Sequence, residues 1–141
     1  MAFGSAESRK KIIYVDDMNV SLIVLKNALK SHYKIFLADS IEKMNKIMKK
    51  IKPDLILLDI NMPVTDGYEI IKNLKNDKNH CDIPVIFITG NSDKESVEKG
   101  LSLGAAAYVI KPFNSIKLIE AINNQLYPKD RFTSTFHTNR A

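Results

Sequence analysis

The sequence predicts an α/β fold in which one parallel sheet of five strands is covered by five helices. Short apolar runs alternate along the chain with longer segments of helical period, an order that favours right-handed β-α-β crossovers. The apolar runs are nearly continuous, which is typical of strands buried on both faces. At 141 residues the chain has the length of one domain with a substantial core.

The predicted strands are strongest where four apolar residues stand together. The run at 55–58 reads Leu-Ile-Leu-Leu, and the run at 85–88 reads Val-Ile-Phe-Ile. The strands are predicted at 12–15, 33–38, 55–58, 85–88 and 108–110.

The first two helices are predicted from apolar residues at three- and four-residue steps. The first, at about 19–31, is expected to carry one apolar face, which lies on or near Val20, Ile23, Val24, Ala28 and Leu29. The second begins near Ser40 and must stop before Pro53, because proline disfavours a helical residue before it.

The last three helices are predicted from the turns and caps that precede them. The third, at about 68–76, follows a turn that ends in Asp66-Gly67. The fourth begins at Ser92-Asp93-Lys94-Glu95, which has the spacing of a capping box, and ends near 103–104. The fifth is predicted at 115–127.

Composition is ordinary for a globular domain, with 45% hydrophobic and 26% charged residues. No apolar stretch approaches the roughly 20 residues needed to span a bilayer, so no membrane contact and a cytoplasmic location are expected. Residues 1–9 are expected to be a leader or a cloning remnant, 10–127 the folded domain and 128–141 a mobile tail. The net charge of +5 comes from lysines on the predicted helices, which are interpreted as solvated faces.

Polar residues follow four of the predicted strands, at the point where each strand ends. They are Asp16 and Asp17 after the first, Asp59 after the third, Thr89 after the fourth and Lys111 after the fifth. Because ligands bind beyond the carboxyl ends of strands in such sheets, these side chains are expected to converge at one edge. Each residue alone could be a cap or turn former, but four such coincidences in one fold are improbable.

Three crowded carboxylates indicate a hard divalent cation, Mg²⁺ or alternatively Mn²⁺, because unneutralised charges would raise a carboxyl pKa. The backbone carbonyl of Asn61 is a further candidate ligand. Asp59 is the candidate nucleophile for a phosphoryl group, while Thr89 and Lys111 can pair with phosphoryl oxygens.

With these motifs in place, the chain resembles the receiver domains of two-component response regulators. The resemblance covers about residues 10–127. The matching residues are Asp16-Asp17, Asp59, Met62-Pro63, Asp66-Gly67, Thr89 and Lys111-Pro112-Phe113. It implies a flavodoxin-like, doubly wound (βα)5 fold with strand order 2-1-3-4-5. It also implies a signalling domain rather than an enzyme, one that catalyses at most its own phosphorylation and dephosphorylation.

The family resemblance also implies roles for individual residues. A sensor histidine kinase or a histidine phosphotransfer protein would phosphorylate Asp59, Asp16 and Asp17 would hold the metal, and Lys111 would bind the phosphoryl group. Thr89 would sense that group and let Tyr108 turn inward, which changes the face formed by the fourth helix, fifth strand and fifth helix. For Tyr108 the alternative is a half-buried strand tyrosine without a switching role.

The response would pass to a downstream target or to an output domain outside this segment, or phosphorylation would lead to a homodimer.

Two departures from the family pattern concern the site. Gly90 follows Thr89 where alanine is more usual, and Asn61 and Asn91 flank the expected path of hydrolytic water.

Three other functions remain open at this point. The chain could be a degenerate receiver that binds proteins without being phosphorylated. A phosphate-ester hydrolase would generally need an acid two residues after Asp59, where this chain has Asn61. Nucleic-acid binding is suggested only by the net charge, and none is expected for this segment.

Overall fold

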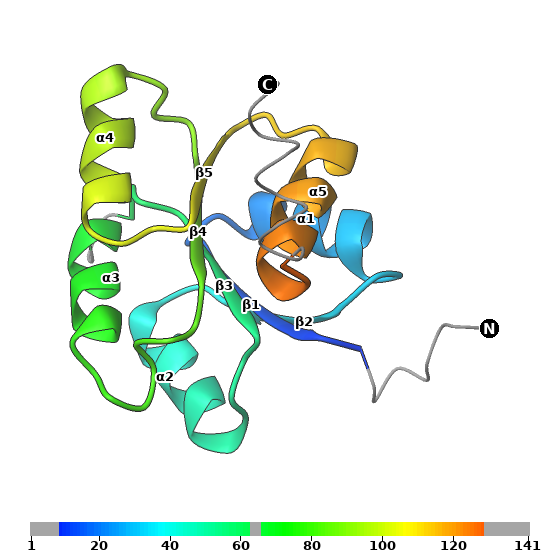
Figure 1. Cartoon of the computed structure of the whole chain (residues 1–141). Helices are drawn as coiled ribbons and strands as arrows, with labels where there is room; N and C mark the ends of the chain where they lie inside the picture. Colours follow the sequence, from blue (N-terminus) through cyan, green and yellow to red (C-terminus); the bar gives the residue numbers. More distant parts are fainter. Residues whose placement is uncertain (1–8, 63–65, 129–141) are drawn as a thin grey trace.

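The computed structural model describes residues 9–62 and 66–128, which form five parallel strands alternating with five helices. The strands are β1 (Lys11–Val15), β2 (Lys34–Ala38), β3 (Leu55–Leu58), β4 (Val85–Thr89) and β5 (Ala107–Ile110). They form one sheet in the order β2-β1-β3-β4-β5 (Figure 1). The predicted flavodoxin-like α/β fold and its strand order are therefore confirmed.

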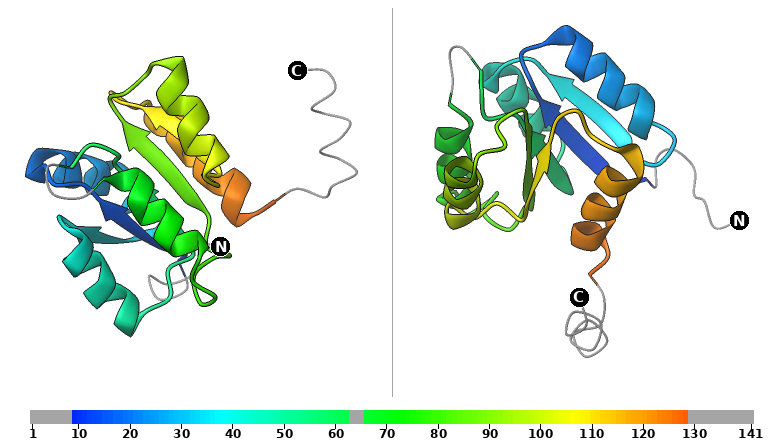
Figure 2. Two further views of the ribbon diagram at one scale, coloured as in Figure 1. Left: turned by 90° about the vertical axis from the view of Figure 1, so that its left-hand side faces the viewer. Right: turned by 90° about the horizontal axis from the view of Figure 1, so that it is seen from above.

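The helices form two layers, with α1 and α5 on one face of the sheet and α2, α3 and α4 on the other (Figures 1 and 2). They are α1 (Asn19–Leu29), α2 (Ile41–Lys50), α3 (Gly67–Lys75), α4 (Lys94–Ser102) and α5 (Ser115–Leu126). In the described part of the chain, no helix combines the length and the apolar character of a membrane span. The expectations for 1–8, for Pro63 and for 129–141 fall outside the described residues.

Each central strand contributes to both layers of the core because successive side chains point to opposite faces. In β1, Ile13 and Val15 pack with the cluster under α2, α3 and α4. Ile12 and Tyr14 pack with the cluster under α1 and α5. Burial on both faces explains why the strands read as continuous apolar runs.

The apolar face predicted for α1 is largely wrong. Val20, Ile23 and Val24 are 69%, 57% and 52% exposed, whereas Leu22 and Leu25, which were not predicted, are buried. Of the predicted residues, Leu29 is buried as expected. Both sets have helical spacing, so the pattern could not decide which one the sheet would cover. The leucines face the sheet, and a valine and isoleucine surface is left open on the helix.

The predicted start of α4 is also corrected. Ser92 is not the capping residue; the Asp93 carboxylate accepts hydrogen bonds from the backbone N–H of Ser96 at 2.9 Å and from its hydroxyl at 2.9 Å. Aspartate is as good an N-cap as serine, and here it also gains the Ser96 hydroxyl. The helix itself ends at Ser102, close to the predicted position.

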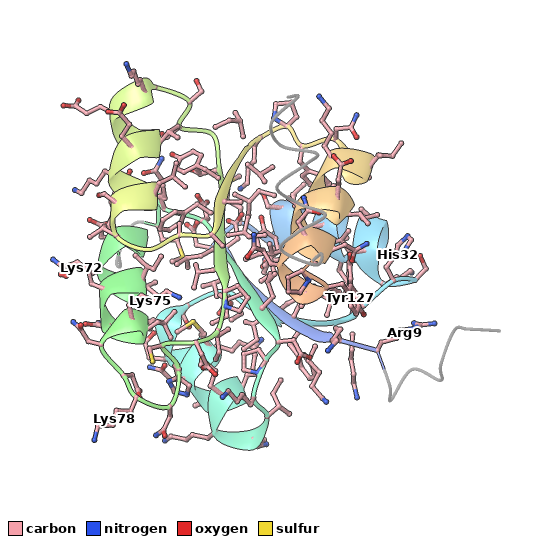
Figure 3. The ribbon with its side chains drawn as sticks, in the orientation of Figure 1. Arg9, His32, Lys72, Lys75, Lys78 and Tyr127 are labelled. Atoms are coloured by element: carbon pink, nitrogen blue, oxygen red, sulfur yellow. The ribbon has the colours of Figure 1, made fainter. Side chains whose placement is uncertain are left out.

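Most of the lysines that were interpreted as solvated are exposed, including Lys43, Lys46, Lys49 and Lys50 on α2. Figure 3 shows Lys72 and Lys78 pointing away from the molecule, whereas Lys75 turns toward the loop that enters β4. The Lys75 ammonium donates hydrogen bonds to the carbonyls of Cys81 at 3.2 Å and Ile83 at 3.0 Å. Lys75 therefore stabilises this loop.

Gly67 sets how closely α3 approaches the end of β3. A Cβ at this position would lie 2.7 Å from the Ile60 Cα and 2.8 Å from the Asp59 carbonyl oxygen. Both neighbours are backbone atoms, so they can yield only if the chain around Asp59 shifts. At Gly90, by contrast, an added Cβ would meet none of the described atoms within 4 Å.

We therefore expect Gly67→Ala to lower the free energy of unfolding by about 1–3 kcal/mol, the usual cost of forcing an atom into a packed region. The matched substitution Gly90→Ala is expected to change it by no more than about 0.5 kcal/mol. Urea unfolding followed by circular dichroism measures both. Equal midpoints for the two variants would show that the contact at Gly67 is not as tight as described.

Candidate functional site

The parallel pairing of β1 with β3 brings Asp16 and Asp59 side by side. Val15 is in register with Leu58, and each aspartate is the residue that follows. The Asp59 N–H donates to the Val15 carbonyl at 3.0 Å, which continues the ladder beyond the strands. Asp17 adds a third carboxylate, and one ligand atom from each of the three lies within 4.8 Å of the others. The structure thus brings together the acidic residues predicted to converge.

Lys111 supplies a positive charge from the end of β5. Its ammonium lies 2.6 Å from an Asp16 carboxylate oxygen and 3.5 Å from an Asp59 oxygen. The Lys111 N–H also donates to the Thr89 carbonyl at 2.8 Å, so the residue continues the pairing of β5 with β4. The ammonium pairs with two of the three carboxylates, and the cluster is left with an excess of negative charge.

Asp16 is held by more donors than the sequence predicted. The Tyr14 hydroxyl donates to its Oδ2 at 2.5 Å, and the Met18 N–H donates to its Oδ1 at 3.0 Å. Burial raises the pKa of Tyr14, and the Asp16 carboxylate raises it further. The sequence analysis assigned no role to Tyr14, although a tyrosine two residues before Asp16 in a strand shares its side of the sheet.

Asp59 is 5% exposed, and burial raises the pKa of its carboxyl above the ordinary value. Lys111 opposes this shift, whereas the nearby Asp16 adds to it. Hydrogen bonds from the Asn61 N–H, at 3.2 Å, and from the Thr89 hydroxyl act in the same direction as Lys111. Asp59 therefore lies in a site where its negative charge is only partly compensated.

Thr89 and Tyr108 are both hydrogen-bonded to Asn91, in the loop that follows β4. This loop lies on the side of Asp59 away from Asp16, because β3 stands between β1 and β4 in the sheet. Thr89 is fully buried, and its hydroxyl oxygen accepts from the Asn91 N–H at 3.5 Å. The Tyr108 hydroxyl donates to the Asn91 carbonyl at 2.9 Å. Burial, with a smaller contribution from Tyr68, raises the pKa of Tyr108 to about 12.

Tyr108 is half-buried, a position that suits both the switch and its structural alternative. Its ring packs edge to face on Phe87, and Phe87 packs in the same way on Tyr68 of α3. Gly100 brings α4 against this cluster, since a Cβ there would lie 2.9 Å from the Phe87 ring. The ring of Tyr108 thus lies under α4.

The donor set fits a hard divalent cation. Three carboxylates offer only oxygen ligands, and oxygen is what Mg²⁺ and Mn²⁺ prefer. Asn61, whose carbonyl is the further candidate ligand, follows Asp59 by two residues and forms an isolated bridge with Asp66. The sequence therefore identified an acidic site whose composition is that of a metal site.

An apolar surface lies beside this site. Its exposed residues are Met18, Val20, Ile23 and Val24 at α1 and Ile116 at α5. A groove of about 500 Å³ runs between these helices, lined by Val20, Val24 and Phe113 among others. Tyr14 and Lys111, which both contact Asp16, also line it.

Comparison with known proteins supports one family. The model of the response regulator receiver domain matches residues 12–123. The chain is 34% identical to the phosphate regulon transcriptional regulatory protein PhoB of Pseudomonas aeruginosa, over 78% of this chain and 48% of that protein. It is 36% identical to a Vibrio cholerae protein named "Probable cyclic di-GMP phosphodiesterase", over 86% of this chain and 28% of that protein.

Among solved structures, the chemotaxis protein CheY4 of Vibrio cholerae superposes with a TM-score of 0.78 at 25% sequence identity. The match covers 84% of this chain and all of CheY4. The two curated relatives are longer, and the chain spans about half of one and less than a third of the other. Since the family model covers most of the chain and the acidic site lies where the matching motifs meet, the chain belongs to the receiver domains of two-component response regulators, a family of signalling domains rather than enzymes.

Proposed function

We propose that this receiver domain accepts a phosphoryl group on Asp59 from a histidine kinase or a histidine phosphotransfer protein, in a reaction that requires Mg²⁺. The observation that supports this most directly is the position of Asp59. Its carboxylate is nearly buried, next to two further carboxylates and 3.5 Å from the Lys111 ammonium. A nucleophile, a cation site and a group for phosphoryl oxygens therefore share one pocket.

In the proposed reaction, an Asp59 oxygen forms a bond to phosphorus while the bond from phosphorus to the donor's imidazole nitrogen breaks. The electron pair of that bond leaves with the imidazole. A bound Mg²⁺ supplies charge neutralisation for the carboxylates and the phosphoryl oxygens. The ion would be held by Asp16, Asp17, Asp59 and the Asn61 carbonyl. Lys111 would pair with a phosphoryl oxygen.

The proposed response is a population shift in the face formed by α4, β5 and α5. Thr89 would move toward the phosphoryl group, and Tyr108 would turn further inward behind it. Support comes from the hydrogen bond between Tyr108 and Asn91 and from the Phe87 ring that Tyr108 and Gly100 both contact. The face would then control a target protein or an output domain.

A protein donor must bring its phosphohistidine to the edge where Asp59 lies. The apolar surface defined above by Met18, Val20, Ile23, Val24 and Ile116 lies beside that edge and is open. Exposed apolar patches beside a polar site are typical of protein interfaces. We therefore propose that the kinase or phosphotransfer protein covers this surface.

We also propose 10–127 as the bounds of the domain, supported by helices and strands from Lys11 to Leu126.

Acetyl phosphate tests the phosphoacceptor directly, because it needs no protein donor. With Mg²⁺, the intact mass of the wild type is expected to increase by one phosphoryl group, in a base-labile form. No increase is expected with EDTA or in Asp59→Asn. Asp82→Asn, which changes an exposed carboxylate that pairs with Lys52, is the matched control and should be labelled like the wild type.

Failure of acetyl phosphate to label the wild type in the presence of Mg²⁺ would contradict the proposal. The remaining interpretation would be a degenerate receiver that acts by binding alone. Labelling that persists in Asp59→Asn would instead place the phosphoryl group on another residue.

The raised pKa of Asp59 predicts a pH-dependent stability. The folded state binds the Asp59 proton more tightly than the unfolded state does, so this carboxylate destabilises the fold once pH rises through the folded pKa. Without metal, Asp59→Asn is therefore expected to be more stable than the wild type at pH 7. The difference should shrink as pH falls toward the unfolded pKa of about 4. Urea midpoints of both proteins at pH 7 and near pH 4 measure the difference in stability. Glu42→Gln, at an exposed carboxylate of α2, is the control.

Mg²⁺ should reverse this order at pH 7. A cation at about 100 times its Kd adds about 2.7 kcal/mol to the stability of a protein that binds it only when folded. The wild type, with all three carboxylates, should gain more stability from Mg²⁺ than Asp59→Asn does. Urea midpoints with and without the cation measure the two gains. An Asp59→Asn variant that is less stable than the wild type without metal would contradict the interpretation of Asp59 as an uncompensated charge.

A further inference from the structure

Asn61 and Asn91 pair through their side-chain amides. The Asn61 Nδ2 donates to the Asn91 Oδ1 at 2.9 Å, and the Asn91 Nδ2 donates to the Asn61 Oδ1 at 3.4 Å. Asn61 belongs to the loop after β3 and Asn91 to the loop after β4. This reciprocal pair therefore joins two loops, one on the Asp59 side of the site and one on the Thr89 side.

Each asparagine is also tied to a functional part of the site through its backbone. The Asn61 N–H donates to Asp59 at 3.2 Å, and the Asn61 carbonyl is a candidate metal ligand. The Asn91 carbonyl accepts from the Tyr108 hydroxyl at 2.9 Å. A continuous chain of contacts thus runs from Asp59 through Asn61 and Asn91 to Tyr108.

This chain of contacts reaches Tyr108 without requiring Thr89 to move. Thr89 begins the same loop, and its hydroxyl accepts a long hydrogen bond of 3.5 Å from the Asn91 N–H. A change in the Asn61 loop would therefore act on the Asn91 loop through the two amides. Since Asn91 also presents the acceptor for Tyr108, the change would alter the position that the tyrosine prefers.

We propose that the Asn61–Asn91 amide pair couples cation binding at the three carboxylates to the position of Tyr108, before any phosphoryl group is transferred. The inference rests on the proposed function for the cation site and goes beyond it, because it makes the cation an effector of the switch. Coupling of this kind is reciprocal, so a change at Tyr108 must also alter the affinity for the cation.

The test is an Mg²⁺ titration of the unphosphorylated protein, followed by NMR of ¹³C-labelled tyrosine rings. Tyr108→Phe assigns the Tyr108 signals and also removes the hydroxyl that bonds to Asn91. In the wild type, Mg²⁺ is expected to shift the Tyr108 ring signals. In Asn91→Ala the cation should still bind, with a Kd about two- to fivefold weaker, the size of effect expected for one neutral hydrogen bond. The Tyr108 shift should then be lost or strongly reduced.

Two further variants separate coupling from a local disturbance. Asn61→Ala keeps its backbone carbonyl and should reduce the Tyr108 shift as Asn91→Ala does. The double variant should show no further reduction, since both substitutions break the same pair. Asn45→Ala, at an exposed asparagine of α2, should behave like the wild type. Tyr108→Phe should change the Mg²⁺ Kd in the same direction as Asn91→Ala.

The outcomes distinguish this proposal from the proposed function. Mg²⁺ binding that shifts Tyr108 equally in the wild type and in Asn91→Ala would overturn the coupling and leave the cation site intact. Mg²⁺ binding without any shift of Tyr108 in the wild type would do the same. Failure of the wild type to bind Mg²⁺ would overturn both proposals.

Discussion

The site depends on one constraint, the parallel register between β1 and β3. Because Val15 lies opposite Leu58, the residues that follow them must present two carboxylates at neighbouring positions of the same edge. Like charges held this close are unfavourable unless a cation or hydrogen-bond donors offset them. Lys111, the Tyr14 hydroxyl and the Met18 N–H all converge on Asp16, while Asp59 receives weaker compensation. Of the two buried carboxylates, Asp59 is therefore the one whose negative charge is less fully compensated.

The sequence predicts the sheet and the acidic site well because both depend on local order along the chain. A buried strand followed by a polar residue places that residue at the edge wherever the strand lies in a parallel sheet. Prediction from the sequence fails at α1, where two apolar stripes satisfy the same helical period. Only packing on the sheet selects Leu22, Leu25 and Leu29. The Asn61–Asn91 pair is hidden for a related reason, since the two residues are 30 positions apart and meet only because β3 pairs with β4.

Close backbone approach links the site to the helices that would report its state. Gly67 lets α3 begin against the carbonyl of Asp59, and Gly100 lets α4 rest on the Phe87 ring beside Tyr108. Packed contacts of this kind deform little, so a displacement at Asp59 or Tyr108 has to be taken up by moving a whole helix. The proposed change in the face formed by α4, β5 and α5 would use this packing, since Gly100 of α4 and Tyr108 of β5 both lie against the Phe87 ring.

Electrostatics also explains why a receiver of this composition would need a metal although its net charge is +5. The lysines that produce this charge lie on exposed helix faces such as that of α2, where solvent and salt screen them. An incoming phosphoryl group instead meets three carboxylates and one ammonium that already contacts Asp16 at 2.6 Å. The local field opposes an anion, whatever the net charge of the chain. A divalent cation held by the carboxylates would reverse that field at Asp59, so the arrangement of the site itself supports the proposed need for a metal in phosphoryl transfer.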